Sequence, residues 1–397
     1  MRIKRFLIPA FLVLGTLLVL VALLRPVRET EDGTENVYRI AMITDSGGIT
    51  DRSFNQNTFE ACRDYALQHN MEYNYFKPEV NSDYARSAMV NLAVARGYNI
   101  IVMPGFLFAQ TIVEETKRYP EVKFIALDVS KDIICAAAVG NKYYADPQAY
   151  NAADYYNTKN TYCAIYQEEI PGYMAGYMAV KSGYRRLGFL GGEAVPAVVR
   201  YGYGFLQGIN DAAEELGVVD DISVQYAYAG QFYASTELTA AMDTWYSRGT
   251  EVVFAAGGTI FHSVGEAAAK AGGKMIGVDN DQRPIIDTYG KGMTVTSAMK
   301  KLDRTVFAAL DAIIYQNRWE KEYAGKADDL GLISGSELDK NYVGLPDKGT
   351  QWSDKFTRED YARLVKELAE KKRTVDSAVD EMPSLKIQVK VRAGTIM

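Results

Sequence analysis

The sequence predicts an α/β protein built from two similar lobes, each a doubly wound parallel sheet with helices on both faces. Short apolar strand patterns alternate with helical patterns along most of the chain, which is typical of βαβ units. The alternation begins again after Gln167, so the chain contains two such series. Its 397 residues also exceed the size of one ordinary domain.

The first series covers residues 38–127 and begins with a β-branched and apolar run at 38–44. Ser82 is a helix N-cap signal, and Gly97 marks the end of the same helix. The run 100–103 is apolar throughout, as in a buried strand. The expected strands are 38–44, 73–76, 100–103 and 123–127, and the expected helices are 54–68, 82–96 and 109–119.

A second series follows a joint near residues 167–171. Gly202, Gly204 and Gly208 miss the dinucleotide-binding pattern G-x-G-x-x-G by one residue, so we interpret them as turn and packing positions. Residues 293–297 are extended and lead into a helix that ends near Gln316. The expected strands are 187–190, 223–228, 252–255 and 275–278, and the expected helices are 174–182, 205–216, 236–248 and 262–271.

Two regions depart from this alternation. Residues 136–159 are rich in Tyr and Asn, and we interpret them as an insertion. Beyond Trp319, a Gly-rich segment leads to a charged helix at 357–372 and a short β-like tail at 386–391. Cys135 and Cys163 flank the insertion and are expected at strand ends. They could form a disulfide in an oxidising compartment or remain two reduced, buried thiols.

The composition excludes several classes of function. Lys and Arg total 44 and Asp and Glu total 50, a net charge of −6 with no basic block, so nucleic acid is not an expected partner. With 2 His and 3 Cys, we expect neither a metal site nor a disulfide scaffold. P-loop and nucleophile-elbow motifs are absent. We therefore expect a protein that is not an enzyme and uses no cofactor.

The first 35 residues predict a signal or anchor segment followed by a linker. Three of the first five residues are basic, and residues 6–24 carry no charge. At about 1.5 Å per residue, this run nearly spans a bilayer core. Neither an A-x-A cleavage pattern nor a lipidation cysteine follows it, since the first cysteine is Cys62. We expect this segment to keep the chain on the membrane, with the bulk of the protein outside the cytoplasm.

Ligands of open parallel sheets bind beyond the carboxyl ends of the strands, so the residues that follow each strand matter most. Asp45 and Asp279 follow strands at equivalent places in the two series, beside Gly-rich turns. A carboxylate there can accept hydrogen bonds from vicinal hydroxyls, as acidic residues do with ribose. A helix N-cap would explain one isolated Asp equally well. Two in equivalent positions favour a ligand site.

These loops carry motifs that resemble those of the basic membrane protein family, the nucleoside-binding lipoproteins of ABC importers. The more specific matches are residues 42–56 (MITDSGGITDRSFNQ) and 276–282 (IGVDNDQ). Supporting matches are residues 166–169, 172–176, 199–205, 254–259 and 296–303. The resemblance covers about residues 38–316, but the lipidation cysteine of the family is missing and the insertion is not part of its pattern.

The resemblance implies a type I periplasmic-binding-protein fold, with a hinge and a ligand cleft between two lobes. It places the second crossover between lobes at 295–297 and the third near 331–335. The expected organisation is an anchor and linker at 1–35, an N-terminal lobe at 36–167 plus 297–330, a C-terminal lobe at 168–296 plus about 331–350, and a helical and tail segment at 351–397.

The resemblance also implies roles for individual residues. Phe54 matches an aromatic residue that stacks on a purine ring, and Tyr201 matches one that closes on the opposite face. Stacking of this kind is worth about 1–3 kcal/mol per base. Asp45 matches a polar contact to the base edge. Asp279 matches the carboxylate that holds the ribose hydroxyls, and Lys300 matches a donor to the same sugar.

Four further residues complete the expected ligand site. Ser46 belongs to the loop after the first strand, and Asn55 is a candidate with a helix cap as its alternative. Gly105 and Gly258 would let the backbone approach the ligand closely, because glycine has no β carbon.

The leading hypothesis is a monomeric, extracytoplasmic binding protein that delivers a purine nucleoside to the permease subunits of an ABC importer. A ligand that bridges the lobes would stabilise a hinge-closed form. The rivals are a membrane-tethered sensor or regulatory protein of the same fold and a binder of a sugar or another small solute. A secreted hydrolase has little support, because the sequence offers no nucleophile–base pair.

Overall fold

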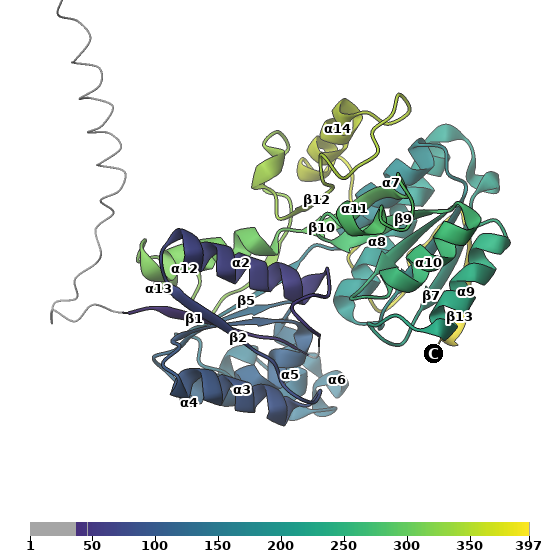
Figure 1. The fold of residues 1–397 in the computed structure, drawn as a ribbon. Coiled ribbons are helices and arrows are strands. Elements are labelled where there is room, and N and C mark those ends of the chain that lie inside the picture. Colours follow the sequence, from purple (N-terminus) through teal and green to yellow (C-terminus); the bar gives the residue numbers. More distant parts are fainter. Residues whose placement is uncertain (1–36, 46, 397) are drawn as a thin grey trace, which may run out of the picture.

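Two sheets, one in each lobe, organise the chain (Figure 1). The computed structural model describes residues 37–45 and 47–396. The expected anchor segment and Ser46 lie outside the described residues. In the part of the chain that is described, no helix combines the length and the apolar content needed to cross a membrane. The predicted division into two α/β lobes is confirmed.

The N-terminal lobe holds six parallel strands in the order β11-β5-β4-β3-β1-β2. Its strands are β1 (Arg39–Ile43), β2 (Glu72–Phe76), β3 (Ile100–Pro104), β4 (Lys123–Leu127), β5 (Thr161–Tyr166) and β11 (Ala327–Leu330). Its helices are α2 (Phe54–Gln68), α3 (Asp83–Ala95), α4 (Ala109–Arg118), α5 (Lys131–Val139), α6 (Lys142–Ala145), α12 (Leu302–Ile314) and α13 (Trp319–Glu322).

Helices cover both faces of this first sheet (Figure 1). Successive residues of a strand point to opposite faces. In β1, Ile40 and Met42 pack with residues of α2 and α12, whereas Ala41 and Ile43 pack with residues of α3, α4 and α5. The near-continuous apolar runs seen in the sequence therefore reflect strands that are buried on both sides.

The C-terminal lobe holds seven strands in the order β12-β10-β9-β8-β6-β7-β13, of which only the short β12 is antiparallel to its neighbour. Its strands are β6 (Arg186–Gly191), β7 (Ser223–Tyr228), β8 (Val252–Ala256), β9 (Lys274–Asp279), β10 (Thr294–Lys300), β12 (Val343–Gly344) and β13 (Gln388–Thr395). Its helices are α7 (Glu169–Lys181), α8 (Pro196–Leu216), α9 (Thr236–Ser247), α10 (Phe261–Ala271), α11 (Arg283–Ile286) and α14 (Arg358–Ala369).

Glycines let helices α7 and α8 of this lobe pack very closely against each other. A β carbon at Gly204 would lie 2.1 Å from the carbonyl oxygen of Glu169, and one at Gly208 would lie 2.0 Å from that of Tyr173. The glycines of residues 202–208 are therefore packing positions inside a helix and not turns. Helix α8 begins at Pro196, nine residues earlier than the expected start at 205, because packing against α7 outweighs the low helix propensity of glycine.

The chain passes between the lobes three times. It leaves β5 for α7, leaves β10 for α12, and leaves β11 for β12. The second passage was expected at residues 295–297, but β10 stays paired with β9 up to Met299 and ends at Lys300. The second lobe therefore keeps this whole strand, and the third passage lies between Leu330 and Val343.

The C-terminal residues belong to the second lobe and do not form a segment of their own. Tyr361 and Leu364 of α14 lie in the same apolar core as α7 and α8. Strand β13 adds an edge to the second sheet and runs parallel to β7. The expected separate segment at 351–397 is corrected accordingly, since burial of one face of α14 requires the lobe beneath it.

The first residues of the expected insertion at 136–159 belong to helix α5 of the first lobe. Helices α5 and α6 lie on the connection from β4 to β5, and β5 is an interior strand of the sheet that was not expected. Cys135 lies on α5 and Cys163 within β5, so neither stands at a strand end. Both are free, buried thiols in one apolar core, and no disulfide joins them.

Candidate functional site

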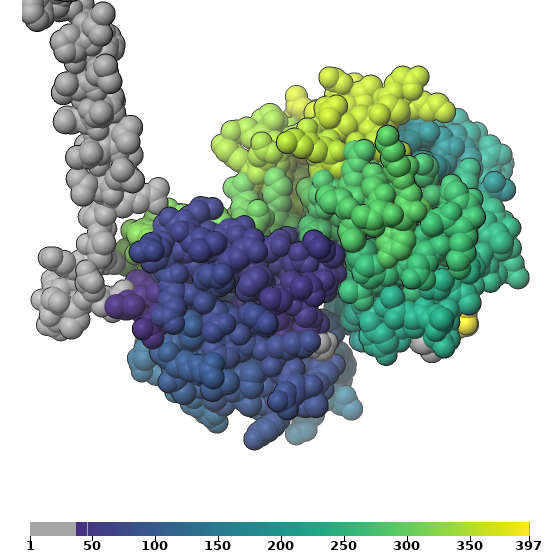
Figure 2. Space-filling model, in the orientation of Figure 1, coloured from purple at the N-terminus to yellow at the C-terminus, as the bar shows by residue number. Residues whose placement is uncertain are grey.

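The carboxyl ends of strands from both sheets meet at the junction of the lobes. On the first sheet, Asp45 lies two residues beyond β1 and Asp128 directly follows β4. On the second sheet, Asp279 ends β9 and Lys300 ends β10. The lobes touch in the space-filling view, where purple N-terminal residues abut green residues of the second lobe (Figure 2). Open α/β sheets bind ligands at such strand ends.

Two carboxylates hold the loop after β1. Asp45 Oδ1 accepts hydrogen bonds from Gly47 N at 2.7 Å and from Asn55 Nδ2 at 2.9 Å. Asp51 accepts from three backbone N–H groups at the start of α2, at 2.9, 3.1 and 3.0 Å. Asn55 lies inside α2, whose N-cap is Ser53, so the helix-cap alternative for Asn55 is wrong. Its amide also donates to Asp51 at 3.1 Å and so links the two carboxylates of this loop.

Two hydrogen bonds cross from this loop to the second lobe. Ser53 Oγ donates to Asp279 Oδ2 at 2.5 Å, and Gln282 Nε2 donates to the carbonyl oxygen of Arg52 at 2.9 Å. Ser53, Asp279 and Gln282 are all buried. The sequence singled out Asp279 but gave no role to Ser53 or Gln282, although both lie inside the two most specific motifs.

Lys300 is the centre of charge at the junction. Its side chain is 2% exposed, and Nζ lies 2.5 Å from Asp128 Oδ2 and 3.0 Å from Glu168 Oε1. The pair with Asp128 is a further link between lobes. Sequence reasoning missed Asp128 and Glu168, although Asp128 follows a strand as Asp45 does.

Three aromatic rings surround the same ammonium group. Lys300 Nζ lies 4.9 Å from the ring centroid of Phe54, 5.4 Å from that of Tyr166 and 5.6 Å from that of Tyr201. These are distances at which a cation is attracted to a ring face. Phe54 is half-buried, whereas Tyr201 is buried within α8, where its ring meets Phe254 edge-on. The structure therefore brings Phe54, Tyr201 and Lys300 together.

The backbone is strained at three positions around the site. Arg52, Asp128 and Asp279 have φ angles of 55°, 57° and 64°, in the left-handed region that non-glycine residues seldom adopt. Such conformations cost about 1–3 kcal/mol each and tend to cluster at functional sites. All three residues lie in strand-end loops whose groups cross between the lobes.

Four buried polar atoms near these strand ends have no hydrogen-bond partner. They are Thr44 Oγ1, Asp128 Oδ1, Tyr201 Oη and Asn280 Oδ1. A buried polar atom without a partner costs about 1–3 kcal/mol. A polar ligand in the junction would supply donors and acceptors for such atoms.

Burial and charge shift the pKa values of the ionisable groups in opposite directions. Burial raises the pKa of Asp279, and Lys300 and the Ser53 hydroxyl oppose this rise. Burial likewise raises the pKa of Glu168 against the effect of Lys300. Burial alone would lower the pKa of Lys300, but Asp128, Glu168 and Asp279 raise it overall. The ammonium group therefore stays charged and offsets part of the acidic charge around it.

The two expected glycines are explained by contacts within the chain. A β carbon at Gly258 would lie 2.2 Å from the carbonyl oxygen of Phe232, and one at Gly105 would lie 3.3 Å from Asp45 Oδ2. Both have positive φ angles, 52° and 120°. The carbonyl oxygen of Phe232 leaves no room for a β carbon at Gly258, and the positive φ angle favours glycine at Gly105.

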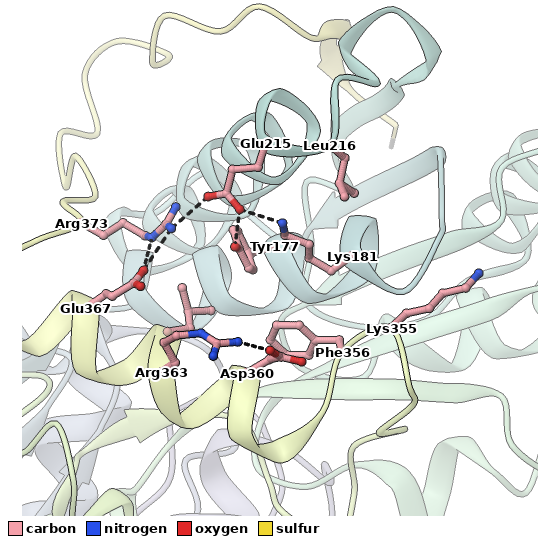
Figure 3. A pocket seen from close by; sticks show the side chains of 11 residues that line it. Tyr177, Lys181, Glu215, Leu216, Lys355, Phe356, Asp360, Arg363, Glu367 and Arg373 are labelled. Atoms are coloured by element: carbon pink, nitrogen blue, oxygen red, sulfur yellow. Dashed lines mark hydrogen bonds and ion pairs between the residues drawn. The ribbon is translucent and has the colours of Figure 1, made fainter.

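A hollow of about 500 Å³ lies away from the lobe junction, between α7, α8 and α14 (Figure 3). Arg373 crosses it to Glu215 at 2.9 Å and to Glu367 at 3.0 Å, and Lys181 reaches Glu215 at 2.7 Å. Its charged groups thus pair largely with one another. Within the described residues, no group of three or more His, Cys, Asp or Glu side chains is arranged to hold a metal ion.

Comparison with known proteins relates most of the two-lobed region to one group. A protein-family model described as ABC transporter substrate-binding protein PnrA-like matches residues 38–375. A CD4+ T-cell-stimulating antigen of Listeria innocua is 26% identical over 333 residues, which are 79% of this chain and 82% of the antigen. The ABC transporter nucleoside-binding protein BmpA of Lactococcus lactis is 27% identical over 258 residues, 62% of this chain and 64% of that protein.

Solved structures support the fold. A solute-binding protein of an ABC transporter system from Aeropyrum pernix aligns with a TM-score of 0.61 and 21% identity, over 86% of this chain and 88% of that one. The agreement confirms the two-lobed binding-protein fold that the motifs predicted.

Proposed function

This chain belongs to the PnrA-like family of ABC transporter substrate-binding proteins, as its loop motifs predicted, and on that premise we propose that it binds a purine nucleoside between its lobes. The family binds solutes and is not a family of enzymes. A small-molecule ligand and a permease partner follow from the same membership. The family membership does not identify the ligand, and the purine nucleoside is our proposal.

The observation that carries the proposal is the meeting of aromatic rings, strand-end carboxylates and one ammonium group at the lobe junction. Phe54 and Tyr201 offer ring surfaces for a base, at about 1–3 kcal/mol of stacking per base. Asp279 offers a carboxylate and Lys300 an ammonium group for sugar hydroxyls. Unpartnered atoms such as Asp128 Oδ1 and Asn280 Oδ1 add acceptors for donors of the ligand.

The contacts also constrain how the ligand enters. Asp279 Oδ2 accepts from Ser53, and this hydrogen bond fixes how the carboxylate presents its oxygens to a ribose hydroxyl. Lys300 Nζ lies over the Phe54 ring, so a base can stack on that face only after the ammonium group moves toward the sugar. Asp45 Oδ1 already holds two donors of its own loop, which leaves Oδ2 for the base edge.

Closure of the lobes around the nucleoside would present the form that the permease subunits recognise. The basic N-terminus followed by the uncharged run at 6–24 supports a place outside the cytoplasm and attachment to the membrane. The relative named a nucleoside-binding protein supports the choice of ligand class.

The proposal is tested by titration calorimetry with adenosine, guanosine, inosine and their free bases. Phe54→Ala should weaken the binding of nucleosides and of free bases alike, raising Kd by about 5- to 150-fold, because it removes stacking area. Asp279→Asn should weaken the binding of nucleosides and leave the binding of free bases nearly unchanged, because free bases carry no ribose. Asn adopts the left-handed region as readily as Asp, so this variant keeps the backbone of the loop.

Phe59→Ala is the matched control for the aromatic variant, since Phe59 is also half-buried on α2 but contacts Tyr73 and Tyr75. It should leave every Kd unchanged. The proposal that the ligand is a nucleoside is refuted if the wild-type protein binds none of the nucleosides or bases below millimolar concentration. Binding of a sugar in the same experiment would reassign the rings to sugar-ring stacking.

A further inference from the structure

The loop before α2 and the loop after β9 touch across the lobe junction through two side chains that the ligand roles above do not use. We infer that Ser53 and Gln282 are positioning residues that hold the two lobes together and fix the Asp279 carboxylate between them. The inference rests on the proposed function for the identity of the ligand, but not for the contact itself. We name this pair of contacts the interlobe latch.

Ser53 is rigidly held on its own lobe. It is 0% exposed, and its backbone N–H donates to Asp51 Oδ1 at 2.9 Å. Asp51 is in turn fixed by the first turn of α2. The Ser53 hydroxyl therefore reaches Asp279 Oδ2, at 2.5 Å, from a loop that cannot adjust freely. A hydrogen bond to a carboxylate at this separation is short and charge-assisted.

Gln282 is likewise held by hydrogen bonds within the second lobe. It is 1% exposed, its Oε1 accepts from Val278 N at 3.0 Å, and its backbone N–H donates to Ser297 Oγ at 3.1 Å. One donor group remains, and Nε2 directs it to the Arg52 carbonyl oxygen at 2.9 Å. The amide thus joins β9 to the other lobe through the residue next to Ser53.

The strained backbone belongs to the partners of the latch. Arg52, whose carbonyl accepts from Gln282, has φ 55°, and Asp279, which accepts from Ser53, has φ 64°. Strain of this kind persists where the surroundings fix the conformation. Both left-handed residues aim their accepting oxygens at the opposite lobe, so the strain accompanies the contact on each side.

The latch also affects the ligand-binding carboxylate. Ser53 donates to Oδ2 of Asp279, so it fixes how this carboxylate is turned toward a ligand hydroxyl. The same hydrogen bond forms only when the lobes are close. Ser53 thereby couples the orientation of a ligand-binding carboxylate to closure of the protein.

Closure is measured first, without any solute, as a distance distribution between spin labels on the two lobes. Labels are placed by cysteine substitution at Tyr84, which is 85% exposed on α3, and at the exposed Glu237 on α9. The native cysteines at 62, 135 and 163 are buried, so labelling is selective. Ser53→Ala and Gln282→Glu should each increase the ratio of long to short distances about tenfold, because each removes one donor of the latch.

The variants have matched partners within the chain. Gln282→Glu keeps an oxygen that can accept from Val278 and replaces the donor to Arg52 with a charged carboxylate oxygen, and Gln231→Glu introduces the same charge. Ser53→Thr keeps a hydroxyl and should restore the wild-type distances. Ser263→Ala and Gln231→Glu are the controls, since both side chains are buried and donate to backbone oxygens within the second lobe. They should leave the distances unchanged.

Distances that are the same in Ser53→Ala, Gln282→Glu and wild type overturn the latch. Adenosine titration then tests its coupling to the ligand: Ser53→Ala should raise Kd about tenfold, and Ser53→Thr should restore it. If the wild-type protein does not bind adenosine, only the proposed ligand is refuted, because the distances measured without solute still test the latch. Adenosine binding that is unchanged in Ser53→Ala refutes the coupling to Asp279.

Discussion

Two clusters of charged side chains and tyrosines lie at opposite ends of helix α7. At its start, Lys300 lies among Asp128, Glu168 and three aromatic rings in the lobe junction. Near its end, Arg373 lies against Tyr177 and pairs with Glu215 and Glu367 at the hollow (Figure 3). The Lys300 side chain is 2% exposed and that of Arg373 is 20% exposed.

The difference between the clusters lies in what each leaves unsatisfied. The junction contains unpartnered polar atoms and left-handed residues, and its contacts run between lobes. The hollow joins elements of one lobe, and its ion pairs are partly exposed. A cluster that retains unsatisfied groups and strain is poorly explained as a device for stability alone, whereas the paired hollow is explained well in that way.

Removing Lys300 should give the largest effect and is the strongest test of this contrast. In Lys300→Met, the carboxylates of Asp128, Glu168 and Asp279, the last two of them buried, lose their compensating charge. Breaking a buried pair in this way costs about 3–5 kcal/mol of unfolding free energy. Urea denaturation at neutral pH measures the loss, and nucleoside binding should disappear in parallel.

Lys270→Met is the control, because its pair with Asp243 is exposed, at 62% and 39% of the side-chain surfaces. A surface pair of this kind is worth about 0–1 kcal/mol. Equal stability of the Lys300 and Lys270 variants would show that the junction charges are not buried in solution, and the comparison of the two clusters would fail.

Sequence reasoning located the strand-end carboxylates because parallel sheets place ligand loops at predictable positions. It therefore found Asp45 and Asp279 without the structure. It did not find that Tyr201 is buried, because Gly202 and Gly204 weaken the helical pattern and hid the first turns of α8. Only packing against α7 shows that this segment is helical.

Contacts between segments that are distant in the chain could not be predicted from the sequence either. Lys300 and Asp128 are 172 residues apart, and Ser53 and Asp279 are 226 apart, so no local pattern pairs them. The edge strand β13 was expected to be β-like, but its partner β7 lies far earlier in the chain. Propensity identifies such elements, whereas the choice of partner depends on the assembled core.

Glu169 provides a second test, at the junction end of α7. It is 5% exposed, its Oε2 has no hydrogen-bond partner, and burial raises its pKa from 4.5 to about 7. The folded chain therefore holds this proton over a range in which the unfolded chain has lost it. The stabilising contribution is complete below pH 4.5 and is lost as the pH rises through about 7.

Glu169→Gln should remove this loss. The variant should match wild type near pH 4.5 and exceed it by up to about 3 kcal/mol at pH 8, since one pKa unit corresponds to about 1.4 kcal/mol. Urea denaturation across this pH range measures the difference, and the exposed Glu237→Gln variant should show none. A difference between Glu169→Gln and wild type that does not change with pH would mean that Glu169 titrates normally.

The smallest effect is expected at the hollow, where Arg373→Met removes a partly exposed network within one lobe. Arg373 donates to Tyr173 at 2.9 Å and to two carboxylates, so its loss should cost about 1–2 kcal/mol of unfolding free energy. Arg363→Met is the control, because Arg363 is 64% exposed and pairs only with Asp360, and it should cost less than about 0.5 kcal/mol. Both variants should bind nucleosides as wild type does, because neither residue reaches the lobe junction. Weakened binding in Arg373→Met at full folding would instead give the hollow a functional role and remove the contrast between the two ends of α7.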